Sequence, residues 1–454
     1  MRRIAFLSFD WNYETMALYY EGMEECLRGM DDVQLFVFNA SGQSASYESD
    51  EGSLELFDLC DIERYDGFLI QGNRAWPPEM RQAVVDDILR LGKPVVSVNY
   101  QLDGATIVGT DNYDAEFGLV SKVLSEKGCT RPAFVNGLIS SWEAKDRSQA
   151  FWSACTERGI ASPRYYQASW EMESGVETAL KILRAPDDLP DVIFCCNDDL
   201  AVGVQTTLQE HGVRVPEDVY VTGFDNREMG RRAQPRITTV DRDYRSIGAR
   251  ALQTVMALLD GADVPPFVVS DARYVLSESC GYPAKGESRV SADDVHSENT
   301  ALSRFFEVLS KFQPSVLNAD SLLEVIIACE RYLPELGCPN AYLTLNEGYL
   351  GADAALASVP YGLHALLVAH SGTSVKTGCD ERHVYESFRS RDILPRELST
   401  GGGMHMVYPL RRGTACMGTL VTEGVSPLLG RGFISIILTL LSSAIEGAHR
   451  REAS

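Results

Sequence analysis

Two short apolar segments between residues 190 and 240 constrain the fold most tightly. Residues 192–196 lead into Asn197, and residues 219–222 are followed at once by Gly-Phe-Asp-Asn, whose acidic residue is Asp225. Between them, apolar residues recur three or four positions apart, as in an amphipathic helix that ends at Gly212. A strand, a helix and a strand in this order predict parallel pairing, with the carboxyl ends of both strands at one edge of the sheet. We therefore expect Asn197 and Asp225 at the edge where open α/β sheets bind ligands.

The same alternation of strands and helices extends over the first 280 residues. A first series has strands at residues 3–9, 33–38, 67–71 and 94–98 and helices near residues 53–60 and 77–91. A second series has strands at residues 106–109, 133–136 and 165–168 and helices at residues 113–127, 143–158 and 174–183. This order predicts an α/β fold with two doubly wound parallel sheets, which form two lobes with a cleft between them.

Four motifs in this region resemble the effector domain of the lac repressor (LacI/GalR) family. They are Asn-Asp-Asp-Leu-Ala-Val-Gly from residue 197, Val-Pro-Glu-Asp-Val from residue 215, Gly-Phe-Asp-Asn from residue 223 and Pro-Arg-Ile-Thr-Thr-Val from residue 235. The resemblance covers residues 1–282 and implies the two-lobed, periplasmic-binding-protein-like type 1 fold. In that family the chain crosses between the lobes three times, so residues 243–259 are expected to return to the first lobe.

The resemblance also implies which residues hold a ligand. It places on pocket positions, or facing them from the first lobe, the residues Asp10, Trp11, Tyr13, Trp142, Arg147, Trp170, Asn197, Asp225 and Tyr244. Their chemistry suits a carbohydrate, because hydroxyl groups need polar partners and the C–H face of a sugar needs a flat aromatic surface. Each type of residue also has a structural alternative: Asn and Asp cap helices, Trp packs in cores, and Arg forms surface ion pairs. Asp111, in Gly-Thr-Asp-Asn-Tyr-Asp, matches the family too and is equally compatible with a structural role.

Enzymatic motifs are missing from the sequence. The seven histidines are scattered, and neither His-Glu-x-x-His nor Gly-x-Ser-x-Gly occurs. The glycine triplet at residues 401–403 is not followed by Lys-Ser or Lys-Thr, as a phosphate-binding loop would require. We expect no catalytic residue, no metal and no cofactor.

Composition indicates a cytoplasmic protein outside the membrane. The eleven cysteines include no Cys-x-x-Cys pair, which fits a reducing compartment. The apolar run at residues 4–9 is too short for a signal peptide, and the run at residues 432–445 is too short to span a bilayer.

The charge balance and the start of the chain both argue against direct DNA binding. Family repressors carry a helix-turn-helix head before the first strand, whereas the first strand predicted here begins at residue 3. The formal net charge is −23, and DNA affinity depends on basic residues that neutralise phosphates. The densest basic group, Arg227, Arg231, Arg232 and Arg236, is interpreted as a solvated loop.

The last third of the chain predicts a separate, smaller α+β domain. We expect domain boundaries at residues 1–282, a Ser-, Gly- and acid-rich linker at 283–299, and a domain at 300–454. This domain has predicted helices at 300–312 and 322–333, strands at 341–346, 363–369, 404–410 and 417–423, and a final amphipathic helix. The pattern resembles a GAF-type sensory domain. The final helix carries an apolar stripe of Leu429, Phe433, Ile437, Leu440, Leu441 and Ile445, which predicts a homodimer with paired helices.

The sequence thus predicts a cytosolic sensor of a small, sugar-like molecule, in which lobe closure is relayed to the C-terminal domain. Two alternatives remain. The chain could be a LacI-like transcriptional regulator that reaches DNA through a missing domain or a partner. It could also be the sensory part of a diguanylate cyclase or histidine kinase that continues beyond Ser454.

Overall fold

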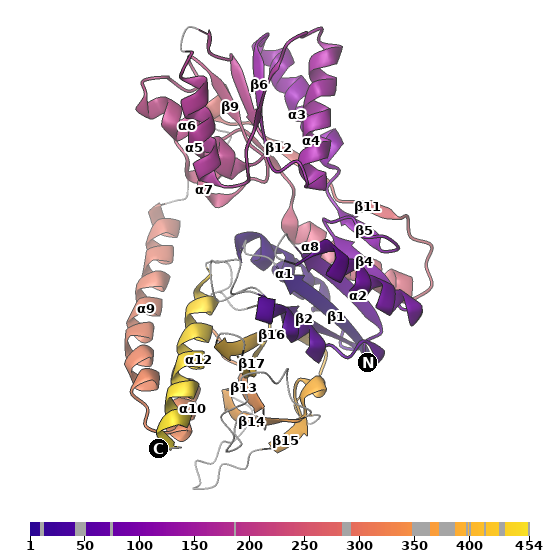
Figure 1. Cartoon of the computed structure of the whole chain (residues 1–454), viewed down its shortest axis with the longest axis vertical. Coiled ribbons are helices and arrows are strands. Elements are labelled where there is room, and N and C mark those ends of the chain that lie inside the picture. Colours follow the sequence, from indigo (N-terminus) through magenta and orange to yellow (C-terminus); the bar gives the residue numbers. More distant parts are fainter. Residues whose placement is uncertain are drawn as a thin grey trace. The chain divides into compact units, whose positions relative to one another are not determined.

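The chain folds into two compact units (Figure 1). Unit 1 comprises Met1–Val108, Tyr244–Val268 and Val290–Ser454, and unit 2 comprises Gly109–Asp243 and Val269–Arg289. The structure is a computed structural model, and it describes residues 1–9, 13–40, 51–72, 76–185, 188–283, 292–346, 364–371, 386–395, 398, 401–412, 415–425 and 432–452.

Unit 2 is a four-stranded parallel sheet between two pairs of helices (Figure 1). The strand order is β7 (Arg164–Gln167), β6 (Pro132–Asn136), β8 (Val192–Cys195) and β9 (Tyr220–Thr222). Helix α3 packs beside α4, and α5 beside α6; the bounds are Asn112–Lys127, Trp142–Glu157, Met172–Ile182 and Asp198–Glu210. A short helix α7 (Glu228–Arg232) and an antiparallel pair, β10 (Thr239–Asp241) with β12 (Arg273–Val275), complete the unit. Both faces of the sheet are buried, which explains the continuous apolar strands of the sequence.

The N-terminal part of unit 1 is a second parallel sheet. Its strands lie in the order β5, β4, β3, β1, β2, with bounds Thr106–Gly109, Val95–Val98, Gly67–Gly72, Arg2–Phe9 and Val33–Asn39. Helices α1 (Tyr13–Leu27) and α8 (Tyr244–Leu259) pack on one face, and α2 (Pro78–Arg90) packs on the other. β11 (Phe267–Val269) is the neighbour of β5. The predicted α/β class with parallel sheets is confirmed.

The returning helix α8 lies in unit 1, as the resemblance implied. The backbones of α8 and α1 are in direct contact at two glycines. An added Cβ on Gly22 would lie 1.9 Å from the carbonyl oxygen of Arg245, and one on Gly248 would lie 2.1 Å from the carbonyl oxygen of Tyr19. Two details of the prediction were wrong. Residues 106–109 pair with β4 in the first sheet and do not start the second, and Glu51–Leu59 forms a 3-10 helix in place of an α-helix.

The C-terminal part of unit 1 begins with two helices, α9 (Ala292–Leu317) and α10 (Leu322–Tyr332). Helix α9 starts inside the segment predicted as a linker. An antiparallel sheet follows, with strands β13, β14, β15, β16 and β17 at Ala341–Asn346, His364–Ser371, Glu386–Arg389, Gly403–Arg412 and Ala415–Glu423. Strand β16 also pairs in parallel with β2, so both parts of unit 1 share one eleven-stranded sheet.

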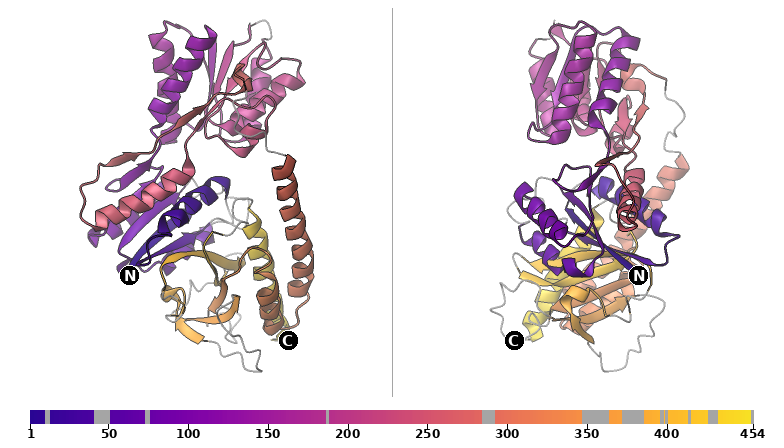
Figure 2. Two further views of the ribbon diagram at one scale, coloured as in Figure 1. Left: turned by 180° about the vertical axis from the view of Figure 1, so that it is seen from behind. Right: turned by 90° about the vertical axis from the view of Figure 1, so that its right-hand side faces the viewer.

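The final helix α12 (Phe433–Glu452) buries much of its apolar stripe inside unit 1. Ile437, Leu441 and Ile445 are fully buried, and Phe433 stacks on Phe305 of α9 with ring centroids 4.8 Å apart. Figure 2 shows α9 and α12 running side by side. Leu429 lies outside the described residues. Among the described helices, none is long and apolar enough to cross a membrane.

A buried histidine lies at the junction of β2 and β16. The ring of His405 stacks on the ring of Phe36 with centroids 4.9 Å apart. The guanidinium carbon of Arg3 lies 4.9 Å from the centroid of the same phenyl ring. Burial lowers the pKa of the imidazole below its ordinary value of 6.5; Glu423 acts in the opposite direction, and Arg3 acts with burial. The folded state therefore favours neutral His405.

We expect unit 1 to lose stability as the pH falls below about 6.5, because the unfolded chain then binds a proton that folded His405 resists. Above that pH both states hold a neutral ring, and the effect vanishes. His405→Phe keeps the stacked ring and removes the titration. Thermal unfolding of both proteins from about pH 7.5 to about pH 5.5 should give the smaller decrease in melting temperature for the variant. Equal decreases would contradict the prediction, and His405→Gln provides a second non-titrating variant.

Candidate functional site

Polar side chains gather at the carboxyl edge of the unit 2 sheet. Asn197 follows β8 and caps α6, whereas Asp225 follows β9 with a backbone φ of 105°. Arg147 reaches the same edge from the second turn of α4. The sequence order of strand, loop and helix therefore delivers these residues to the edge predicted for a ligand.

The side chain of Arg147 is buried at this edge and fixed by several contacts. It is 1% exposed, and its Nε and Nη2 donate to the Oδ1 atom of Asn112 at 3.0 and 2.8 Å. Its Nη1 donates to the carbonyl oxygen of Cys196 at 2.6 Å, and the guanidinium carbon lies 3.7 Å from the ring centroid of Phe224. A planar guanidinium held on both edges and one face has a fixed orientation. The alternative of a surface ion pair is therefore wrong.

Two carboxylates and a second arginine surround this guanidinium. Oδ1 of Asp225 lies 3.7 Å from Nη2 of Arg147 and 3.4 Å from Nη1 of Arg242. Oε1 of Glu143 lies 2.8 Å from Nη1 of Arg242 and 3.6 Å from Nη2 of Arg147. Burial alone would raise the pKa of Glu143, but the two arginines outweigh burial and lower it. We call Glu143, Arg147, Asp225 and Arg242 the ion cluster; with both acids ionised, it has no net charge.

Asn197 and Trp170 adjoin the ion cluster and hold each other in place. Oδ1 of Asn197 accepts from the backbone N–H of Leu200 at 2.9 Å, and its Nδ2 donates to the carbonyl oxygen of Trp170 at 2.9 Å. Asn197 therefore caps helix α6, which is the structural alternative considered for this residue. The indole of Trp170 lies on Gly137, where an added Cβ would come within 2.7 Å of the ring. Only glycine at position 137 leaves room for this placement.

The remaining predicted ligand residues are Trp142, Tyr13, Tyr244, Asp10 and Trp11. Trp142 is the first residue of α4 and is partly exposed. Tyr13 and Tyr244 belong to unit 1, where Tyr244 is 8% exposed and meets Tyr19 edge to face with centroids 5.3 Å apart. Asp10 and Trp11 lie outside the described residues. Within unit 2, the structure thus brings together Arg147 and Asp225, with Trp170 and Asn197 beside them.

Three residues of this edge were not predicted as ligand-binding: Asn112, Glu143 and Arg242. Asn112 could have been predicted from the sequence, because it belongs to a segment that resembles the family. Its neighbour Asp111 has a structural role: it caps α3 by accepting from the backbone N–H of Asp114 at 2.9 Å. Glu143 precedes Arg147 by one helical turn, a spacing that favours an ion pair. Arg242 gives no local signal, since its partners lie on other elements.

Asp198, the second residue of the Asn-Asp-Asp motif, has a structural role. It is fully buried and accepts from the hydroxyl of Thr239 at 2.7 Å and from the backbone N–H of Arg227 at 2.6 Å. A Cβ on Gly223 would lie 2.2 Å from its Oδ1 atom. This contact explains why the Gly-Phe-Asp-Asn and Thr-Thr motifs accompany the aspartate, because all three close around one carboxyl group.

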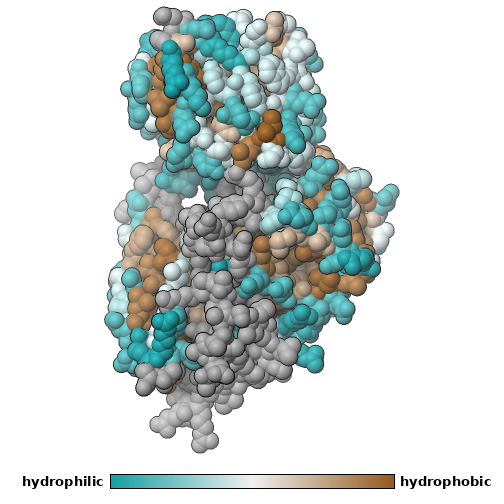
Figure 3. All heavy atoms as spheres, in the orientation of Figure 1, coloured by the Kyte–Doolittle hydropathy of each residue, from teal (hydrophilic) through white to brown (hydrophobic). Residues whose placement is uncertain are grey.

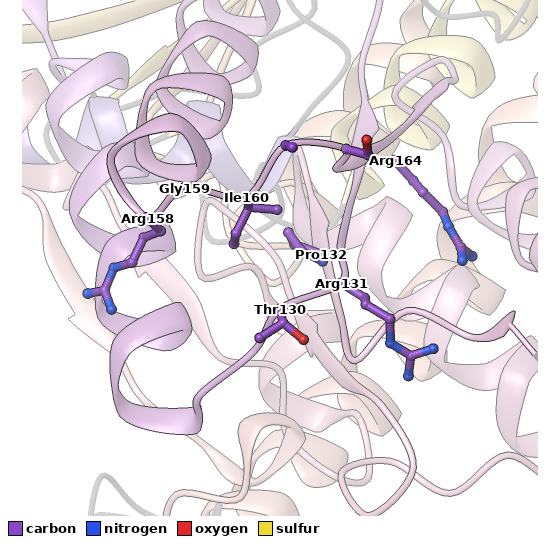
Figure 4. Close-up of a pocket in the computed structure, with 9 residues that line it drawn as sticks. Thr130, Arg131, Pro132, Arg158, Gly159, Ile160 and Arg164 are labelled. Carbon is purple, nitrogen blue, oxygen red and sulfur yellow. The ribbon is translucent and has the colours of Figure 1, made fainter.

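A separate hollow lies near the amino ends of β6 and β7 (Figure 4). Its volume is about 480 Å³, and its lining includes Arg131, Arg158 and Arg164. Figure 4 shows that Arg158 points away from Arg131 and Arg164, whose side chains extend toward the same side. Arg131 and Arg164 lie 3.8 and 2.5 Å from Oδ1 of Asp188. Arg131 and Arg164 are thus already paired with one carboxylate of the protein, and Arg158 donates to the carbonyl oxygen of Ser121 at 3.1 Å, so the ion cluster is the stronger candidate site. Among the described residues, no group of three or more His, Cys, Asp or Glu side chains could hold a metal.

Removal of Arg147 should destabilise unit 2. Arg147→Ala leaves the amide oxygen of Asn112 without its donor and two carboxylates with one fewer cation, and such losses cost about 3 to 5 kcal/mol when a buried pair is broken. Lys145→Ala, an exposed cation on the same helix, should change the free energy of unfolding by less than about 0.5 kcal/mol. Chemical denaturation measures both, and a small effect at Arg147 would mean that the network is not formed.

Comparisons with known proteins address the same region. Residues 122–280 match a family model described as a periplasmic binding protein-like domain. The chain is 36% identical over 136 residues to the HTH-type transcriptional repressor PurR of Pasteurella multocida, covering 30% of this chain and 40% of that protein. It is 26% identical over 209 residues to the probable HTH-type transcriptional repressor ExuR of Bacillus subtilis, covering 45% of this chain and 61% of that protein. The matches thus span between 40% and 61% of these two relatives.

Solved structures share the fold. A regulatory protein of the LacI family from Chloroflexus aggregans superposes with a TM-score of 0.52 at 18% identity, covering 61% of this chain and 98% of that one. A LacI family transcriptional regulator from Mycobacterium smegmatis gives a TM-score of 0.50 at 23% identity, with the same coverage. The chain therefore contains a periplasmic binding protein-like domain, and its fold is similar to that of LacI family regulators.

Proposed function

We propose that this chain is the small-molecule sensor of a bacterial signalling or transcriptional regulator and that it acts in the cytoplasm. The observation that carries the proposal is the ion cluster at the carboxyl edge of a LacI-type ligand-binding domain. Its side chains are oriented by contacts within the protein itself, and preorganised polar groups of this kind give a binding site its specificity. The relatives named as HTH-type transcriptional repressors support a role in regulation.

The ligand we propose is an uncharged, carbohydrate-like metabolite. With two arginines and two carboxylates, the ion cluster offers donors and acceptors without an excess of either charge. Hydroxyl groups can use both kinds of partner, whereas a phosphate or carboxylate would meet the acids as well as the arginines. Trp170 supplies an aromatic surface beside them. The family resemblance also assigns ligand contacts to Asp10, Trp11, Tyr13, Trp142, Asn197 and Tyr244, and these assignments stay part of the proposal.

Signalling in this proposal requires that the ligand favour one arrangement of the two lobes. A ligand shifts such an equilibrium only by the difference between its affinities for the two forms. The change would be relayed to the C-terminal, GAF-like part, whose antiparallel sheet and flanking helices suit a sensory or relay role. No enzymatic step is part of the proposal. Contact with DNA, if it occurs, would be made by another domain or a partner, given the net charge of −23.

A ligand panel tests the site. We expect neutral pentoses, hexoses or disaccharides to raise the melting temperature of the chain, and sugar phosphates and uronic acids to have less effect. Asp225→Asn should weaken the response about tenfold or more in ligand concentration, because a lost polar partner costs about 1 to 3 kcal/mol. Asparagine tolerates the positive φ at this position, which alanine would strain. Asp114→Asn, at an exposed carboxylate of α3, is the matched control. A response that survives unchanged in Asp225→Asn would reject the assignment.

We further propose a homodimer through the outer faces of α9 and α12. Phe306 is 50% exposed and Ile436 is 38% exposed, and Figure 3 shows hydrophobic residues along α9. Phe433 and Leu440, part of the predicted stripe, are partly buried against the core of unit 1, so substitutions there would disturb folding as well.

Phe306→Asp combined with Ile436→Asp should weaken self-association at least about tenfold, since each buried apolar side chain contributes roughly 1.5 to 3 kcal/mol. Ser303→Asp adds an exposed charge to the same helix and should leave association unchanged. Sedimentation at a series of concentrations measures both. A monomer at every concentration of the unmodified chain would refute the homodimer, and an unchanged dimer in the double variant would place the interface elsewhere.

A further inference from the structure

The edge of strand β2 is occupied by the far end of the same chain. Five residue pairs align β16 with β2 in parallel, from Gly403 opposite Gln34 to Val407 opposite Phe38. On its other side β2 pairs with β1, and β16 pairs with β17. The junction of β2 and β16, called the seam below, is therefore internal to a continuous sheet.

Hydrophobic cores cross the seam on both faces of the sheet. On one face Phe36 and Phe38 of β2 belong to the same buried cluster as Tyr342, Val407 and Val421. On the other face Leu35 and Val37 share a cluster with Met404 and Met406 of β16, and this cluster continues into α1 and α12. Among the described residues, apolar side chains of the N-terminal and C-terminal parts thus share one core on each face, whereas an interface between two tethered domains is more polar.

Polar contacts fasten the same junction. The side-chain amide of Gln34, which is 2% exposed, donates to the carbonyl oxygen of Gly401 at 2.7 Å. Arg64 forms an ion pair with Asp392. A Cβ on Gly402 would lie 2.7 Å from the carbonyl oxygen of Asp31, so the backbones touch where β16 begins. These contacts join residues more than 300 positions apart in the chain.

An uncovered β2 would be a costly edge. All seven of its residues are buried, and an edge strand without β16 would expose unpaired backbone groups between two apolar faces. β16 supplies both the backbone partners and the apolar cover.

We propose that the β2 edge is a docking surface for β16 of the same chain, through which the C-terminal part is locked to the N-terminal sheet as one cooperative unit. Helices α9, α10 and α12 then move with the sheet and are not suspended from it by a linker. If the proposed sensor function holds, displacement of unit 1 reaches these helices directly.

A cross-link in the full chain tests the alignment. Val37 and Met406 are register partners, and Val37→Cys with Met406→Cys places two thiols at a separation that a disulfide spans. Val33→Cys with Met406→Cys is the control, because the same strand offers a buried valine four residues away, about 13 Å along β2. Peptide mapping after oxidation should find the new disulfide in the first variant only. Its absence there, or equal formation in the control, would overturn the alignment.

Hydrogen exchange tests the cooperativity. Met406→Asp places a charge in the seam, and amides of both β2 and β16 should then exchange about tenfold faster or more. Thr439→Asp, on the exposed side of α12, should leave both strands protected. Faster exchange of β16 alone would show that the parts are independent and would refute the proposal. The cross-link and exchange readouts need no ligand, so a failed ligand panel would not affect them, nor would their failure bear on the ion cluster.

Discussion

A guanidinium can remain buried only where opposite charges lie close to it and its N–H groups have acceptors. Unit 2 must meet this requirement around Arg147. Its partners come from α3, from the residue after β8 and from the loop after β9, while α4 carries the side chain itself. Desolvation of an ion costs several kcal/mol, which the surrounding contacts must offset. The helices and strand ends at this edge are therefore held in mutual position by one side chain.

The alternation of strands and helices could be predicted from the sequence because buried parallel strands are continuously apolar and helices repeat every three to four residues. Residues 341–346 were located without error, and most other strands to within one or two residues. Sheet membership was harder. Strand β5 lies between the two series of elements, and nothing local decides which sheet it joins. The pairing of β2 with β16 depends on contacts between distant residues, which hydrophobic periodicity does not encode.

For the candidate site too, some features could be predicted from the sequence and others could not. Arg147 and Asp225 could be placed at one edge because strand ends and family motifs mark them. Asn197 could be placed as well, but whether its amide faces a ligand or caps a helix depends on neighbours such as Leu200 and Trp170. Arg242 escaped prediction, since its carboxylate partners come from α4 and from the loop after β9. Ion clusters are assembled by tertiary structure, and their members need carry no local signature.

The contact between Trp170 and Gly137 has a consequence for how such a site can diverge. The indole rests on bare backbone, so its tilt is set by a residue with no side chain of its own. A single methyl group at position 137 would lift the ring without altering any hydrogen-bonding residue. If the proposed ligand binds beside this ring, related chains can change the shape of the site by a substitution at position 137 while their polar side chains stay the same.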